Sequence, residues 1–159
     1  MAQKQPSRLK RPVAKRPTTW LALGVTFVGA WEGLQTVAYR DPIGVATACY
    51  GETRGIKMGD RFTKEQCDAM LADGLLEFAA GIERCLPPGT PDTRRVAAVS
   101  LAYNIGQGAF LKSTVCRRLQ AGDVQGACDA FMMWAKAGGI EFRGLVNRRK
   151  AERELCLRP

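Results

Sequence analysis

Histidine is absent from all 159 residues of the chain. Because histidine is the side chain that titrates nearest neutral pH, proton transfer in this protein is expected to fall to carboxylates. The absence excludes a histidine-dependent zinc amidase, and the cysteines form no CxxC or CxxH pattern. The sequence therefore predicts neither a metal site nor a cofactor.

A long uncharged run is also missing. Pro17–Trp31 is uncharged but has only 15 residues, below the roughly 20 of a confident membrane span. Residues 1–17 carry six lysines and arginines and no acid, out of a net charge of +9. This order fits an export signal, and it fits equally a solvated tail followed by the buried first helix of a domain. We divide the chain into a basic tail (1–17), an apolar helix or weak signal anchor (18–31) and a catalytic domain (32–159).

Cysteine, by contrast, is plentiful. Six cysteines, an even number in a small chain, fit an oxidising compartment. They stand at positions 49, 67, 85, 116, 128 and 156. Six cysteines allow 15 pairings, and the sequence does not choose among them. Several lie at apolar helix positions, so free thiols stay an alternative for all six.

The first half of the chain predicts a helix, a small sheet and a second helix. The apolar segment 19–31 predicts a helix with Glu32 in its last turn and Gly33 as its stop. Short β-branched pieces around a DPIG turn predict a hairpin or three-stranded sheet over 36–53. A capping box at Thr63-Lys64-Glu65-Gln66 begins a long helix, at about 64–84.

The second half predicts helices alone. They start near Pro91 and continue over about 113–121, 124–137 and 144–157. The fold class is therefore α+β, with a small sheet lobe, a larger helical lobe and a cleft between them.

Three polar residues flank the expected turn: Glu32, Asp41 and Thr47. The helix end and the apolar surroundings both disfavour the ionised form of Glu32, which suits a general acid that must hold a proton near neutrality. Asp41 and Thr47 taken singly are ordinary turn and strand residues. Together the two carboxylates are the minimum needed to cleave a glycosidic bond.

The spacing Glu-x8-Asp-x5-Thr resembles the phage-type lysozymes, or endolysins, of glycoside hydrolase family 24. The resemblance spans about Trp31 to Leu157, and further short matches occur in the right order: Tyr50-Gly51, AYNIGQGAF at 102–110, AGD-x-x-GAC-D at 121–129, WAKAGG at 134–139 and GLVNRRKAERE at 144–154. It implies a lysozyme-like fold. It also implies hydrolysis of the β-1,4 bond between N-acetylmuramic acid and N-acetylglucosamine in peptidoglycan.

Carried over by position, the resemblance assigns Glu32 to protonate the glycosidic oxygen, with Asp41 and Thr47 holding the attacking water. That is an inverting arrangement, for which the two carboxyl groups should lie about 6.5–9.5 Å apart. Asn104 matches a cleft position that contacts sugar, and a helix-end cap is its alternative. Arg148 matches an arginine that pairs with the catalytic glutamate, and an intrahelical pair with Glu152 is its alternative.

The family pattern also sets expectations about place and partners. It implies a monomer that acts on peptidoglycan strands, binds no nucleic acid, is made in the host cytoplasm and acts in the periplasm. The N-terminus resembles a signal-arrest-release segment, so residues 1–31 are expected to associate transiently with the inner membrane. One departure is Glu52, which stands where many members have histidine. It is expected to perturb Asp41 or to replace a structural ion pair.

Two other function classes compete with the hydrolase. A lytic transglycosylase would use Glu32 alone and form an anhydro-muramic product without water, and Asp41 and Thr47 at family spacing argue against it. A non-enzymatic basic protein would bind peptidoglycan, membrane or nucleic acid through residues 1–17. It would keep all its activity when Glu32 is replaced by glutamine.

Overall fold

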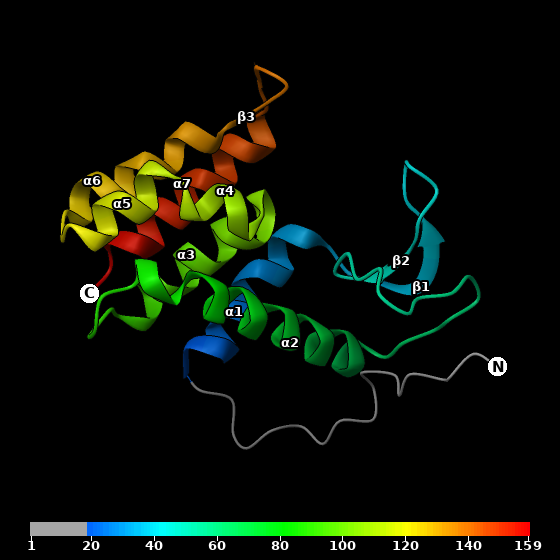
Figure 1. Ribbon diagram of the computed structural model, residues 1–159. Helices are drawn as coiled ribbons and strands as arrows, with labels where there is room; N and C mark the ends of the chain where they lie inside the picture. The colour runs from blue at the N-terminus through cyan, green and yellow to red at the C-terminus, as the bar shows by residue number, and fades with distance from the viewer. Residues whose placement is uncertain (1–18) are drawn as a thin grey trace.

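The computed structural model describes residues 19–159, so the basic tail predicted at 1–17 lies outside the described residues. A small two-stranded sheet stands to one side of a larger helical lobe, and the first helix lies in that lobe and ends on the side toward the sheet (Figure 1). The lobes are therefore arranged as the α+β prediction required.

The first helix, α1 (Thr19–Glu32), packs against α2 (Lys64–Ile82) and α3 (Asp92–Ile105). The approach to α2 is close, because a Cβ added to Gly24 would lie 3.2 Å from Cδ1 of Leu75. The helix ends at Glu32, and Gly33 follows with a φ of +73°, which confirms the predicted stop. Within the described residues, no helix is both long enough and apolar enough to span a bilayer. An additional role of this segment as an anchor stays a prediction.

The sheet is an antiparallel hairpin of β1 (Gln35–Arg40) and β2 (Ala46–Cys49), with a bulge in the pairing. Single bridges join Val37 to Arg61 and Ala48 to Glu52, so the following loop folds back onto both strands. Of the two predicted forms, the two-stranded hairpin is the one observed.

The capping box is confirmed, because the Thr63 side chain accepts from the Gln66 amide while the Gln66 side chain accepts from the Thr63 amide. The remaining elements of the helical lobe follow in chain order: η2 (Glu83–Cys85), α4 (Gln107–Leu111), α5 (Thr114–Gln120), α6 (Val124–Asp129), η3 (Ala130–Trp134), β3 (Lys136–Ala137), β4 (Ile140–Glu141) and α7 (Arg143–Leu157).

The prediction of one helix over 124–137 is wrong. The α-helical part α6 ends at Asp129, a 3-10 turn follows, and Lys136–Ala137 pairs with Ile140–Glu141 as a hairpin. Gly138 and Gly139 have φ values of +58° and +79°, which suit the two central positions of a tight hairpin turn. The two glycines thus serve a strand turn rather than a helix end.

Three disulfides join Cys49 to Cys67, Cys85 to Cys116 and Cys128 to Cys156, and no cysteine among the described residues is free. The first ties β2 to α2 and so fixes the sheet lobe to the helical lobe. The third ties α6 to α7. The first bridge also lines the pocket between the lobes, whereas the third constrains the helical lobe.

Candidate active site

Glu32 lies at the exposed end of α1, where its carboxylate meets a buried arginine from the other end of the chain. The Nη1 of Arg148, on α7, donates to Glu32 Oε1 at 2.7 Å. The Arg148 side chain is 6% exposed and that of Glu32 is 22% exposed. The acid therefore keeps access to solvent while its partner does not.

A buried charged cluster lies behind this pair. The carboxylate of Glu152 accepts from Arg148 Nε at 3.1 Å and from the Ser100 hydroxyl at 2.6 Å. It also lies 3.2 Å from Arg149 Nε. Burial raises the pKa of Glu152, against the opposing effect of the two arginines and of Ser100. Burial likewise lowers the pKa of Arg149. Both alternatives for Arg148 are thus realised, because it pairs with Glu32 and with Glu152.

Asp41 and Thr47 lie together on the hairpin, across the β1–β2 turn. Asp41 Oδ1 accepts from the backbone amides of Ile43 and Val45, at 3.0 and 2.8 Å. The Thr47 hydroxyl donates to the Val45 carbonyl at 3.0 Å, so both side chains are held by the same residue. Thr47 is buried, whereas Asp41 is partly exposed. The turn therefore leaves the second carboxylate oxygen of Asp41 available.

Asn104 lies in the last turn of α3, next to Tyr103. Its Oδ1 accepts from Nη2 of Arg149 at 2.7 Å. A sugar-binding role for Asn104 stays a prediction, and its contact is to α7 rather than to a helix end.

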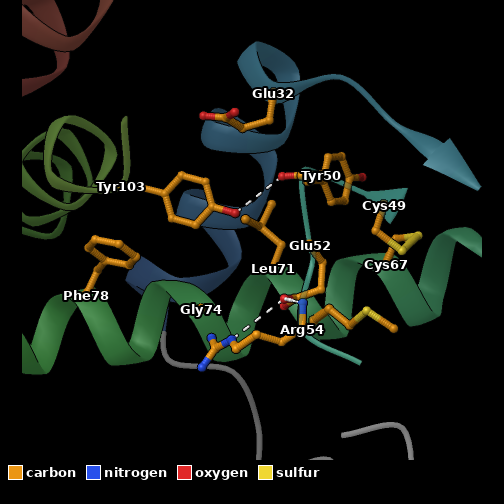
Figure 2. A pocket seen from close by; sticks show the side chains of 12 residues that line it. Glu32, Cys49, Tyr50, Glu52, Arg54, Cys67, Leu71, Gly74, Phe78 and Tyr103 are labelled. Carbon is orange, nitrogen blue, oxygen red and sulfur yellow. Dashed lines mark hydrogen bonds and ion pairs between the residues drawn. A yellow bond between two sulfur atoms is a disulfide. The ribbon is translucent and has the colours of Figure 1, made fainter. Parts of the chain in front are cut away.

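A pocket of ≈ 290 Å³ opens beside Glu32. Figure 2 shows the Glu32 carboxylate above the contact between Tyr103 and Tyr50, whose carbonyl accepts from the Tyr103 hydroxyl at 3.3 Å. Burial raises the pKa of Tyr103 to about 12, and the carboxylates of Glu32 and Glu52 act in the same direction. Tyr103 therefore stays protonated, and able to donate, near neutral pH.

Glu52 lines the opposite wall of this pocket with Arg54 (Figure 2). Its Oε1 accepts from the amides of Thr53 and Arg54 and lies 3.7 Å from Arg54 Nε. Nη2 of Arg54 donates in turn to Oε2 of Glu77 on α2, at 3.0 Å. Glu52 thus takes part in a chain of ion pairs that runs from the pocket wall to α2, and its effect on the site stays a prediction.

The structure joins the predicted residues in two groups. Arg148 contacts Glu32, and Asp41 and Thr47 meet at Val45, but among residues 19–159 no hydrogen bond or ion pair links one group to the other. Sequence reasoning missed Arg149 and the pocket residues Tyr50 and Tyr103. The run Arg148-Arg149-x-x-Glu152, with acid at i+3 and i+4, is the signal that could have found Arg149.

A small sheet lobe and a helical lobe, with an acid at the end of the first helix and a pocket beside it, define a lysozyme-type glycoside hydrolase. The sequence pattern of the phage lysozyme family matches residues 29–152. The SAR-endolysin of Enterobacteria phage P21 is 42% identical over 127 residues, which are 79% of this chain and 77% of that protein. The SAR-endolysin of Pseudomonas phage phiKMV is 35% identical over 150 residues, 91% of this chain and 93% of that protein.

A solved structure agrees with these sequences. A mutant of P22 lysozyme superposes with a TM-score of 0.80 at 32% identity, covering 91% of this chain and 99% of that one. The chain belongs to the phage lysozyme family. It is an endolysin of the signal-arrest-release type, a muramidase that hydrolyses peptidoglycan and thereby causes host lysis.

Proposed function

We propose that Glu32 is the general acid of this muramidase, and that Asp41 and Thr47 hold and activate the attacking water. The observation that carries the assignment is the position of Glu32, at the end of α1, beside the pocket and in contact with a buried arginine. Asp41 supports it, because its carboxylate is fixed by two backbone amides without being buried.

The proposed reaction inverts the anomeric carbon of the N-acetylmuramic acid residue. Water forms a bond to that carbon as the bond to the bridging oxygen breaks, and Glu32 gives its proton to the departing oxygen. Asp41 takes a proton from the water, while the Thr47 hydroxyl orients it. A lytic transglycosylase mechanism uses no attacking water and would therefore give Asp41 no role.

Replacing Glu32 by glutamine tests this assignment. Glutamine keeps the size and one acceptor of the side chain but cannot give up a proton, so peptidoglycan clearing should fall at least about 100-fold. A turbidity assay on chloroform-treated Gram-negative cells measures the loss, and Glu154→Gln, an exposed change on α7, is the control. Equal clearing by Glu32→Gln and wild type would refute the central assignment.

We also propose that the enzyme acts in the periplasm as a monomer and that α1 is tethered at the inner membrane before release. Because α1 carries Glu32 at its end, the site cannot assemble while α1 is held in lipid. Cell fractionation should find the protein with membranes before the membrane potential is dissipated, and free and active afterwards. A protein that is soluble and active throughout would overturn the tether.

A further inference from the structure

Glu152 is a fully buried carboxylate on α7, behind the active site rather than in it. It contacts both consecutive arginines of that helix, Arg148 at 3.1 Å and Arg149 at 3.2 Å. The Ser100 hydroxyl of α3 donates to the same carboxylate. One acid thus anchors two buried cations.

Each of the two arginines also donates a hydrogen bond to a different residue of the site. Arg148 donates to Glu32, and Arg149 donates to the side-chain oxygen of Asn104, each at 2.7 Å. A guanidinium has donors only, so the Asn104 oxygen must face Arg149 and its NH₂ group is left for other partners. Asn104 therefore presents two donors, which suit the hydroxyl or N-acetyl oxygens of a glycan.

We infer that Glu152 is a positioning residue that acts through Arg148 and Arg149, setting the charge balance around Glu32 and the orientation of the Asn104 amide. The inference rests on the proposed roles of Glu32 and Asn104. Glu152 itself touches neither the pocket nor the reacting atoms.

A stability role alone explains this cluster poorly. Arg149 is fully buried, and its Nη1 has no hydrogen-bond partner among the described residues. Buried ion pairs of this kind are often matched or exceeded in stability by apolar side chains of similar volume. A second buried arginine is better explained by what its Nη2 holds, which is Asn104.

The charged groups around Glu32 and Glu152 give the direction of the expected effect. Glu32 pairs with Arg148 and lies near Arg149 on α7 and Tyr103 on α3. It lines the same pocket as Glu52 and Arg54, which come from the loop after β2. Glu152 faces Ser100 and the two arginines, while Asp129 of α6 pairs with Arg153 on the exposed side of α7. Two cations thus balance two carboxylates, Glu152 and Glu32. Removing one cation should therefore extend activity to higher pH, and removing Glu152 should do the reverse.

The test uses the full chain and the pH profile of kcat/KM on soluble peptidoglycan oligosaccharides. Arg149→Met should move the alkaline limb to higher pH by about one unit, and Glu152→Gln should move it down by about one unit, a tenfold change in rate on that limb. KM should rise about fivefold in both, since Asn104 loses its fixed orientation. The double variant should return the limb to its wild-type position while KM stays raised.

Two exposed changes on the same helix, Lys150→Met and Glu154→Gln, are the matched controls and should leave the profile in place. A fall in Tm with an unmoved alkaline limb in Arg149→Met would overturn the inference, even if Glu152→Gln does not fold. An unchanged KM in these variants would refute the proposed control of the Asn104 orientation. If Glu32→Gln keeps full activity, the assignment of the acid has failed instead, so the two failures are distinguishable.

Discussion

The two sides of the cleft hold their polar side chains by different means. On the hairpin side, Asp41 and Thr47 are fixed by the backbone of residues two to four positions away. On the helical side, Arg148 contacts Glu32, which is 116 residues away in the sequence, and also donates to the buried carboxylate of Glu152. One arrangement is local and partly exposed, whereas the other is long-range and buried.

On the hairpin side, a substitution can therefore change activity without changing stability. On the helical side, the same side chains serve both. A turn held by backbone amides tolerates a change of charge on its side chain, because the amides need only an oxygen acceptor. A buried cluster of two arginines and a glutamate does not, because each ion depends on its partners for solvation. Substitutions on the two sides should therefore lower activity with very different costs in folding.

The largest effect on stability is expected when Arg148, on the helical side of the cleft, is replaced. Arg148→Met removes the partner of Glu32 and one of the two cations at Glu152, and should lower the free energy of unfolding by about 3 kcal/mol. Urea unfolding followed by circular dichroism measures it. The control is Arg153→Met on the same helix, whose ion pair with Asp129 is exposed and is expected to contribute less than about 0.5 kcal/mol. Equal losses in the two variants would show that burial does not distinguish them.

The same contrast explains which parts of the molecule the sequence could predict. The end of α1 at Glu32, the turn at Asp41 and the capping box at Thr63 are each decided by a few adjacent residues, and all three are confirmed. The six cysteines showed no preferred pairing, because pairing depends on where distant segments meet. The roles of the candidate catalytic residues stay predictions.

The errors have the same cause. The segment 124–137 has helical character in isolation, but tertiary packing buries Phe131 in a 3-10 turn and the two glycines close a hairpin. Sequence reasoning assigned Arg149 no role, and the fold shows that it is buried against Glu152 and Asn104. The spacing to Glu152 is visible in the sequence, but the contacts of Arg148 with Glu32 and of Arg149 with Asn104 join residues 116 and 45 positions apart, which no local pattern detects.

The smallest effect on stability is expected on the hairpin side, at Asp41. Asp41→Asn keeps an oxygen for the amides of Ile43 and Val45, so the free energy of unfolding should change by less than about 0.5 kcal/mol. Peptidoglycan clearing should nevertheless fall about 100-fold, because the amide cannot take a proton from water. Asp41→Ala, which also deletes the acceptor, should lose the same activity and about 1 kcal/mol of stability. Clearing assays and urea unfolding on the three proteins separate the two losses. If Asp41→Asn proved as unstable as Arg148→Met, or cleared cells as fast as wild type, the hairpin would not be the locally held and separable half of this site.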